Sequence, residues 1–400
     1  LMTAPLVRPV ATRVVRPEWA ARVVSPAYDS VRPQDRALLL ERDPYVFLHV
    51  TRSPGDADDG ATPAEVTEQN AAALEWLLDQ EVFSELHEPG FYVYRLRTGD
   101  HEQIGIVGDV HLSGVNDGRI GPHERIQPQR ATHLADHIER VGANSSPVAF
   151  GYDDDSVVDE VVARVSAGEP ILDFERDDRL HQTVWAVPAD EVERLSERLS
   201  SHRLYILDGH HRVSAGMENW RRSGYDERAG YVLGAIFPHS QLRVSPFHRR
   251  VADLNGHDLD SLCAEIAAHD FSVRPLDTDE DPMPARPGLF GMYVGGRWFE
   301  IEPFRVHPAE FDATVLQERV LEPVLGVDEA SRAGRLEYLP GTVGLEHLVR
   351  LTDDRGGIAF ALHPVLLRQL IAVVDRGQTL PPKSTYFEPK VRSGLFLAPR

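Results

Sequence analysis

The stretch that decides the fold is Leu204-Tyr205-Ile206-Leu207, followed directly by Asp208-Gly209-His210-His211-Arg212. Four consecutive apolar residues are typical of a short buried strand, and Gly209 lets the backbone turn sharply at its end. Residues 213–222 are expected to form a helix, because their apolar side chains fall on one face and Gly224 provides a stop signal. The stretch therefore predicts a strand–turn–helix unit within an α/β fold.

The polar part of this stretch, called the Asp208–Arg212 motif below, indicates anion binding. Two imidazoles and a guanidinium would lie where the helix begins, beside backbone N–H groups and the positive end of the helix dipole, and such an arrangement binds phosphate. Asp208 would supply a negative group for a metal ion or a substrate amine. The alternative is a polar loop in which the histidines satisfy each other's hydrogen bonds. The residue types favour a site.

Composition limits the class of protein. A chain of 400 residues predicts two or three domains, and its 42% hydrophobic and 26% charged residues are typical of a soluble globular protein. The net charge of −21 opposes binding to nucleic acid or to an anionic membrane. The single cysteine, Cys263, suits a reducing compartment, and no signal pattern or membrane-length apolar run occurs. We expect a cytoplasmic protein with no membrane or nucleic-acid partner.

Lysine usage is a second signal. Only Lys383 and Lys390 occur among 42 basic residues, and both fall in Pro381-Pro382-Lys383-Ser384-Thr385-Tyr386-Phe387-Glu388-Pro389-Lys390. A compact ammonium suits a phosphate oxygen where a planar guanidinium does not fit. Chance clustering is the alternative, and we favour a functional role.

Three segments are expected along the chain: an N-terminal α/β segment over 1–115, a middle segment over 116–254 with an insertion at 153–203, and a C-terminal α/β segment over 255–400. The capping box Thr62-Pro63-Ala64-Glu65 predicts a helix over 62–80. Further helices are expected over 129–140, 157–165, 190–199, 314–321 and 364–374. Strands are expected over 91–96, 103–112, 147–151, 183–187 and 231–237, with a Gly295-Gly296 hairpin between 292–294 and 298–301.

Glu124 is the best candidate for a general base. It lies in a Gly-Pro-His-Glu-Arg loop before an expected helix, where cationic neighbours would keep its carboxylate ionised. The alternative is a carboxylate that only stabilises the helix N-terminus. His133 and His137 have a spacing that can chelate a metal, but surface histidines explain the pair better. Neither a P-loop nor a dinucleotide-binding glycine fingerprint occurs.

Several of these motifs resemble the ParB/sulfiredoxin-like superfamily, and they look closest to its free serine kinase branch. The resemblance rests on Pro122-His123-Glu124, Ile138-Glu139-Arg140-Val141-Gly142, Pro147-Val148 and the Asp208–Arg212 motif. The whole chain also resembles a widespread bacterial family of uncharacterised proteins, through Pro26-Ala27-Tyr28-Asp29 and the lysine motif in addition. The resemblance implies a ParB-like catalytic core, here in the middle segment, that phosphorylates free L-serine with ADP or ATP and Mg²⁺.

The resemblance also implies roles for individual residues. Glu124 would deprotonate the serine hydroxyl, Asp208 would position substrate or metal, and His211 would act in catalysis. Phosphate and nucleotide would be bound by His123, Gly209, His210 and Arg212. The lysine count, and not the resemblance, adds Lys383, Ser384, Thr385 and Lys390 to this group. We further expect Tyr28, Asp29 and Arg249 to line the substrate cleft. Sulfiredoxin has a cysteine where this chain has His210, so thiol chemistry is excluded.

The sequence therefore predicts a nucleotide-dependent kinase that acts on the hydroxyl of free serine or a related small amino acid. One alternative is a nucleotide-binding regulatory switch that transfers no phosphate to a small molecule. Another is a metal-dependent hydrolase built on the histidines. The sequence leaves a homodimer open.

Overall fold

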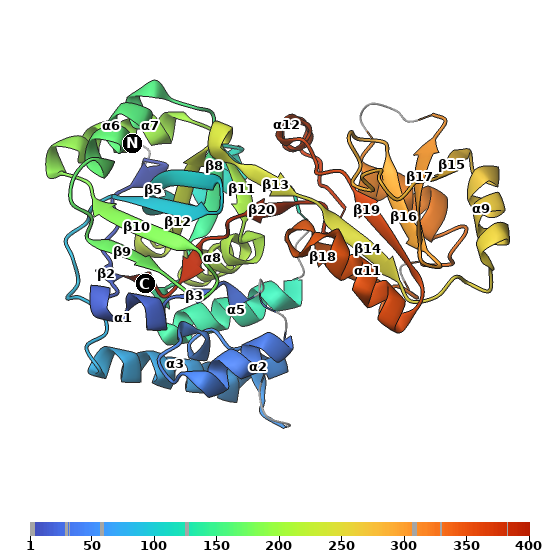
Figure 1. Cartoon of the computed structure of the whole chain (residues 1–400). Coiled ribbons are helices and arrows are strands. Elements are labelled where there is room, and N and C mark those ends of the chain that lie inside the picture. The colour runs from blue at the N-terminus through green and yellow to red at the C-terminus, as the bar shows by residue number, and fades with distance from the viewer. Residues whose placement is uncertain are drawn as a thin grey trace. The chain divides into compact units, whose positions relative to one another are not determined.

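The computed structural model describes residues 5–28, 31, 33–56, 60–124, 128–305, 310–328, 330–381 and 383–400. The chain has a mixed α/β fold, which confirms the predicted class, and it divides into two compact units (Figure 1). The first unit comprises Leu1–Arg243 together with Pro389–Arg400, and the second comprises Val244–Glu388.

A nine-stranded mixed sheet forms the centre of the first unit. Its strand order is β6-β11-β8-β12-β5-β4-β10-β9, and β1 pairs with β5. The strands are β1 (Val7–Arg8), β4 (Tyr92–Thr98), β5 (His101–His111), β6 (Ile120–Gly121), β8 (Val148–Tyr152), β9 (Leu172–Glu175), β10 (His181–Ala186), β11 (Leu204–Asp208) and β12 (Tyr231–Pro238). β12 pairs in parallel with β8 and antiparallel with β5. All eight residues of β12 are buried, as expected for a central strand.

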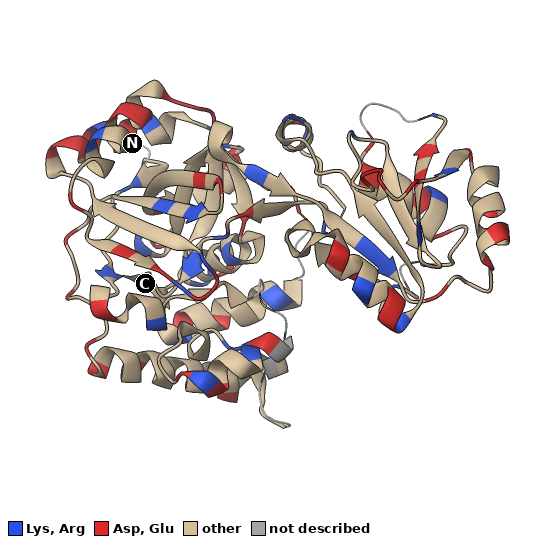
Figure 2. Ribbon diagram, viewed as in Figure 1, with Lys and Arg blue, Asp and Glu red and all other residues tan. Residues whose placement is uncertain are grey.

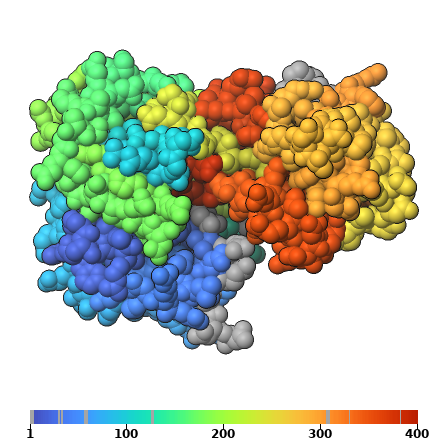
Figure 3. Space-filling model, in the orientation of Figure 1, coloured from blue at the N-terminus to red at the C-terminus, as the bar shows by residue number. Residues whose placement is uncertain are grey.

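Helices pack around this sheet and complete the first core. They are α1 (Pro17–Val23), α2 (Pro33–Arg42), α3 (Pro63–Asp79), α4 (Ser113–Asp117), α5 (Pro128–Val141), α6 (Ser156–Ser166), α7 (Val192–Ser201) and α8 (His210–Arg222). The core includes Phe150 and Ile206 from the strands and Val161 and Leu195 from the helices. In the orientation of Figure 3, N-terminal residues in blue and central residues in green form much of the surface of this unit.

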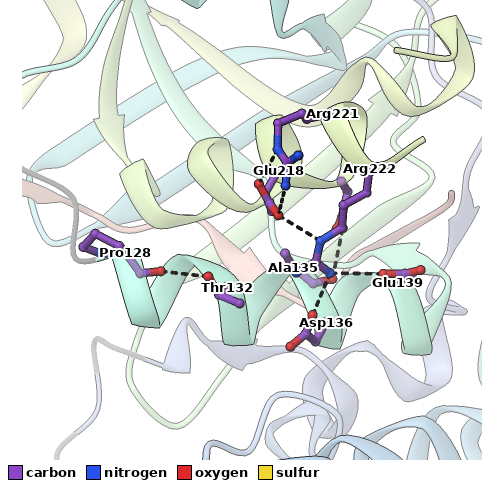
Figure 4. A network of polar contacts seen from close by, with 9 residues as sticks. Pro128, Thr132, Ala135, Asp136, Glu139, Glu218, Arg221 and Arg222 are labelled. Atoms are coloured by element: carbon purple, nitrogen blue, oxygen red, sulfur yellow. Dashed lines mark hydrogen bonds and ion pairs between the residues drawn. The ribbon is translucent and has the colours of Figure 1, made fainter. Parts of the chain in front are cut away.

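α8 carries the Asp208–Arg212 motif at its start and is fixed along its length. Gly216 lets it approach β12 closely, because a Cβ there would lie 2.8 Å from a Val232 methyl. Towards its C-terminus, Arg222 bonds Asp136 at 2.6 Å and Glu139 at 3.3 Å, both on α5 (Figure 4). Asn219 also donates to the Ala135 carbonyl at 3.0 Å. The N-terminus of α8 therefore projects from a rigid support.

The last residues of the chain form part of the first unit. β21 (Arg392–Ser393) pairs with β3 (Ser25–Pro26), and β22 (Phe396–Pro399) pairs with β2 (Arg13–Val14) and β7 (Ala143–Asn144). Arg400 also forms an ion pair with Asp109 on β5. These contacts hold the segment that carries Lys390.

The second unit contains a six-stranded sheet of order β15-β17-β16-β19-β14-β18. The strands are β14 (Phe247–Val251), β15 (Phe271–Pro275), β16 (Phe290–Val294), β17 (Arg297–Pro303), β18 (Leu336–Pro340) and β19 (Ile358–Leu362). The helices are α9 (Leu259–Ala268), α10 (Asp312–Leu316), α11 (Gly344–Arg355) and α12 (Leu367–Asp375). Phe290, Phe360 and Leu316 lie in its core. Short strands β13 (Arg243–Ser245) and β20 (Tyr386–Glu388) complete the named strands.

The element predictions can be compared directly with these bounds. The Thr62 capping box, the 91–112 hairpin, the helix before Gly142 and the Gly295-Gly296 hairpin are confirmed. α8 begins at His210 rather than at 213, because Gly209 takes the N-cap position in the left-handed conformation. The helix expected over 314–321 is a short α-helix that widens into a π-helical turn at Gln317–Leu321.

Several helices of both units carry acidic and basic residues together, as the red and blue segments of Figure 2 show. On α8, for example, Glu218 pairs with Arg221 and Arg222. Exposed pairs of this kind contribute little to stability, because solvent screens them. Among the described residues, no helix combines the length and apolarity that crossing a membrane requires.

Candidate functional site

The site begins where β11 ends and α8 starts. Gly209, the N-cap residue, has φ 98° and ψ 26°, a conformation that strongly favours glycine. A Cβ at this position would also lie 3.0 Å from the Arg212 guanidinium. Glycine has no side chain that could cap the helix, and the structure accordingly shows no side-chain cap on α8. The turn therefore brings a carboxylate, a guanidinium and helix N–H groups together.

Asp208 lies between two cations. One carboxylate oxygen contacts the Lys390 ammonium, and the other pairs with the Arg212 guanidinium at 2.5 Å. The side chains of Asp208 and Lys390 are only 11% and 16% exposed. Burial favours a higher pKa for Asp208, but the charges of Lys390 and Arg212 outweigh it and hold that pKa below its usual range. The carboxylate is thus anionic at neutral pH.

The surroundings fix both cations. Arg212 also donates to the Pro147 carbonyl, immediately before β8. Lys390 follows Pro389, whose carbonyl accepts a hydrogen bond of 3.0 Å from Gln103. No pattern in the sequence indicates the contacts of Pro147 and Gln103, since a carbonyl acceptor and a single glutamine carry no distinguishing signal.

Tyr28 lies close in the pairing register to Lys390. The β3–β21 ladder ends at Pro26 opposite Arg392, and Tyr28 and Lys390 each lie two residues beyond that pair. The Tyr28 hydroxyl contacts that of Ser53, and the Arg36 guanidinium lies 4.1 Å from the centre of its ring. Asp29, predicted as its neighbour in the substrate cleft, lies outside the described residues.

Two buried histidines lie behind the carboxylate of Glu124. The rings of His123 and His210 meet edge to face with centroids 4.4 Å apart. The backbone N–H of His123 donates to His210 Nε2 at 3.2 Å. Burial lowers the pKa of His123 to about 4 and that of His210 well below its ordinary value, with the neighbouring His123 contributing to the latter shift. Both imidazoles are therefore neutral at physiological pH.

Glu124 is the partly exposed member of this group. Its side chain is 33% exposed, and Oε2 lies 3.8 Å from His210 Nδ1. His211, on the first turn of α8, is half-buried. The structure thus brings together Glu124, His123, His210, Asp208 and Lys390 within the first unit. The surface carboxylate can accept a proton, and the ammonium can bind an anion.

Asp208 is a poor ligand for a metal in this arrangement, because each of its oxygens already faces a cation. The described residues hold no cluster of three or more His, Cys, Asp or Glu side chains suited to a metal ion. His133 and His137 do not form such a cluster, and His137 instead contacts Asn70 at 3.3 Å. The protein residues around Asp208 therefore do not fit a resident Mg²⁺ ion.

The remaining predicted residues lie in the second unit. Arg249 is buried on β14, where it donates to the carbonyls of Phe247 at 2.8 Å and Lys383 at 2.9 Å. Burial lowers the pKa of Arg249 to about 10. Arg249, Lys383 and Ser384 line one small pocket with Asp312, whose pKa burial raises to about 6. Ser384 donates to the Pro381 carbonyl at 2.7 Å, and Thr385 is buried.

Fold and site together define a mixed α/β protein in which a strand, a glycine turn and a helix bring the Asp208 carboxylate between the Lys390 ammonium and the Arg212 guanidinium. The chain belongs to the DUF1015 family, described as proteins of unknown function, whose sequence profile matches residues 7–324. No curated protein matches the chain.

The solved structures that are similar to the chain include three different proteins. One is a free serine kinase in complex with AMP, with 14% identity over 75% of this chain and 94% of that chain and a TM-score of 0.38. A conserved hypothetical protein from Pyrococcus furiosus has 14% identity over 72% and 94%, with a TM-score of 0.36. SbnI with a C-terminal truncation, from Staphylococcus aureus, has 15% identity over 73% and 87%, with a TM-score of 0.40.

Proposed function

We propose that the protein is a kinase that transfers a phosphoryl group from ATP or ADP to the hydroxyl of free serine or a related small amino acid. The observation that carries the proposal is the cluster at the start of α8, where Lys390 and Arg212 flank Asp208. Its pattern of residues also resembles that of free serine kinases.

Phosphate binding follows from the charges of the cluster. Lys390 supplies a compact positive charge, and the uncapped N-terminus of α8 supplies backbone donors and a favourable dipole. Phosphoryl transfer needs positioned reactants and positive charge on the phosphate oxygens, and it asks little covalent chemistry of the protein. Mg²⁺ would enter with the nucleotide phosphates, which is its usual mode of binding.

Glu124 would act as the general base. As the acceptor hydroxyl oxygen forms its bond to the terminal phosphorus, the bond from that phosphorus to the nucleotide breaks. The hydroxyl proton passes to a Glu124 oxygen, and the nucleotide leaves one phosphate shorter. The side chain of Glu124 is 33% exposed and therefore accessible to a small acceptor, whereas its neighbours His123 and His210 are buried.

Mass spectrometry tests the proposal directly. The full chain is incubated with ATP or ADP, Mg²⁺ and a panel of free hydroxy amino acids, and phosphorylated products are identified. Glu124→Gln should lower product formation by about 10²–10⁴-fold, the usual contribution of a general base, while nucleotide affinity changes little. Glu346→Gln is the matched control, since that side chain is 95% exposed on the second unit.

Two outcomes would redirect the assignment. Saturable nucleotide binding without any phosphorylated acceptor would favour the regulatory switch. Product formation that is equal in Glu124→Gln and the wild type would remove Glu124 from the role of base.

A further inference from the structure

The two ring nitrogens of His210 face different partners. Nε2 accepts a hydrogen bond of 3.2 Å from the backbone N–H of His123. A backbone N–H can only donate, so Nε2 must be the unprotonated nitrogen of the neutral ring. The proton of the neutral imidazole then resides on Nδ1, which lies 3.8 Å from Glu124 Oε2. The backbone N–H of His123 thereby sets the tautomer of His210, and this tautomer presents its N–H to the Glu124 carboxylate.

The position of His210 is tightly constrained. It is the first residue of α8, directly after Gly209, and its side chain is only 3% exposed. The edge-to-face contact with His123 restricts rotation of the ring. The imidazole is too deeply buried to contact a substrate. It can influence a substrate only through the carboxylate of Glu124.

We propose that His210 is a positioning residue: its Nδ1–H faces Glu124 Oε2 across 3.8 Å and orients that carboxylate toward the acceptor hydroxyl. This inference rests on the proposed kinase function. A neutral N–H donor orients a carboxylate without an adjacent full positive charge, which would weaken it as a base. The ring keeps its proton throughout, because the hydroxyl proton goes to Glu124.

The tautomer can be read without any activity. Long-range ¹H–¹⁵N NMR spectra of the full chain, with histidine labelled, distinguish a protonated from an unprotonated ring nitrogen. The His210 signals are assigned by their loss in His210→Asn. We expect a protonated Nδ1 and an unprotonated Nε2 at neutral pH. The opposite tautomer, or a doubly protonated ring, would overturn the inference.

Two substitutions separate the hydrogen bond from the His123 backbone from the contact with Glu124. His210→Asn keeps an N–H donor near the position of Nδ1, whereas His210→Gln keeps an acceptor near the position of Nε2. The inference predicts that His210→Asn retains kcat within about tenfold, while His210→Gln loses about 10²-fold in kcat with little change in nucleotide KM. The acidic limb of the pH–rate profile should move to higher pH in His210→Gln, because Glu124 loses a donor to its charged form.

The outcomes are distinguishable. If His210 has a purely structural role, His210→Gln should retain more activity than His210→Asn, because the glutamine keeps the bond to the His123 backbone. The pH–rate profile should then be unchanged in both variants. Thermal unfolding of both variants identifies any loss of folding. If the wild type phosphorylates no acceptor, the proposed function fails, and the inferred catalytic role fails with it. The NMR result then still reports whether Nδ1 carries the proton.

Discussion

Two runs of histidine and arginine, the Asp208–Arg212 motif in the first unit and His248-Arg249-Arg250 in the second, have similar composition and different surroundings. The first run begins a helix after a glycine turn, so its polar groups gather at one end of α8. The second run lies within strand β14, paired on both sides by β18 and β19.

The strand gives its polar side chains structural partners. His248 Nδ1 accepts from the Leu362 backbone at 3.2 Å, and burial lowers the pKa of His248 to about 4. Arg250 bonds Glu337 at 2.9 Å and the Gly356 carbonyl at 2.6 Å. Residue type alone therefore does not identify a site. A helix N-terminus, a left-handed glycine and a lysine from a distant segment together distinguish the first run.

The largest expected effect concerns the pair of Asp208 and Lys390. Asp208→Asn removes the buried carboxylate that Lys390 and Arg212 both contact, so we expect a loss of about 3–5 kcal/mol in the free energy of unfolding. Denaturant unfolding measures it. Asp43→Asn, which breaks an ion pair to the 47% exposed Arg22, should cost no more than about 1 kcal/mol. Equal losses in the free energy of unfolding of the two variants would show that the Asp208 cluster stabilises the fold no more than an exposed ion pair does.

The next effect depends on pH. The pKa of His123 is about 4 in the folded chain and 6.5 when unperturbed, so the unfolded chain binds more protons between these values. The free energy of unfolding should therefore rise with pH across this window, by up to about 3 kcal/mol from this group. His123→Asn should flatten the rise, whereas the exposed His133→Asn should not. An unchanged slope in His123→Asn would contradict a buried neutral imidazole.

The smallest effect sharpens the contrast between the two lysines. Lys383 is exposed, with its ammonium 5.4 Å from the centre of the Phe247 ring, so Lys383→Met should change stability by less than about 0.5 kcal/mol. If Lys383 binds phosphate, as the sequence predicts, nucleotide affinity should fall about five- to tenfold. Lys390→Met is the matched variant and should weaken it more. If nucleotide affinity is unchanged in Lys383→Met, the occurrence of a lysine at position 383 is due to chance.

Much of the fold was predictable because it follows from local patterns. The geometry of the Thr62 capping box and of the Gly295-Gly296 turn is determined by a few consecutive residues. The first residue of α8 was not predictable, because a glycine at this position is equally typical of a helix N-cap and of a loop. The return of Pro389–Arg400 to the first unit depends on pairing with strands more than two hundred residues away, which no local signal records.

The candidate site was predictable by residue type and only in part by contact. The motif placed Asp208 and Arg212 together, and the scarcity of lysine singled out Lys390. The contact between Lys390 and Asp208, and the buried pair of His123 and His210, needed the tertiary structure. The contact of each Asp208 oxygen with a cation also needed the tertiary structure.

The most direct test of the central claim is phosphoryl transfer by the wild type and Glu124→Gln, with ATP or ADP, Mg²⁺ and free serine, read by mass spectrometry. The account predicts phosphoserine, or another phosphorylated hydroxy amino acid from the same panel, that falls at least about a hundredfold in Glu124→Gln. Nucleotide binding with no phosphorylated acceptor in the wild type would contradict it.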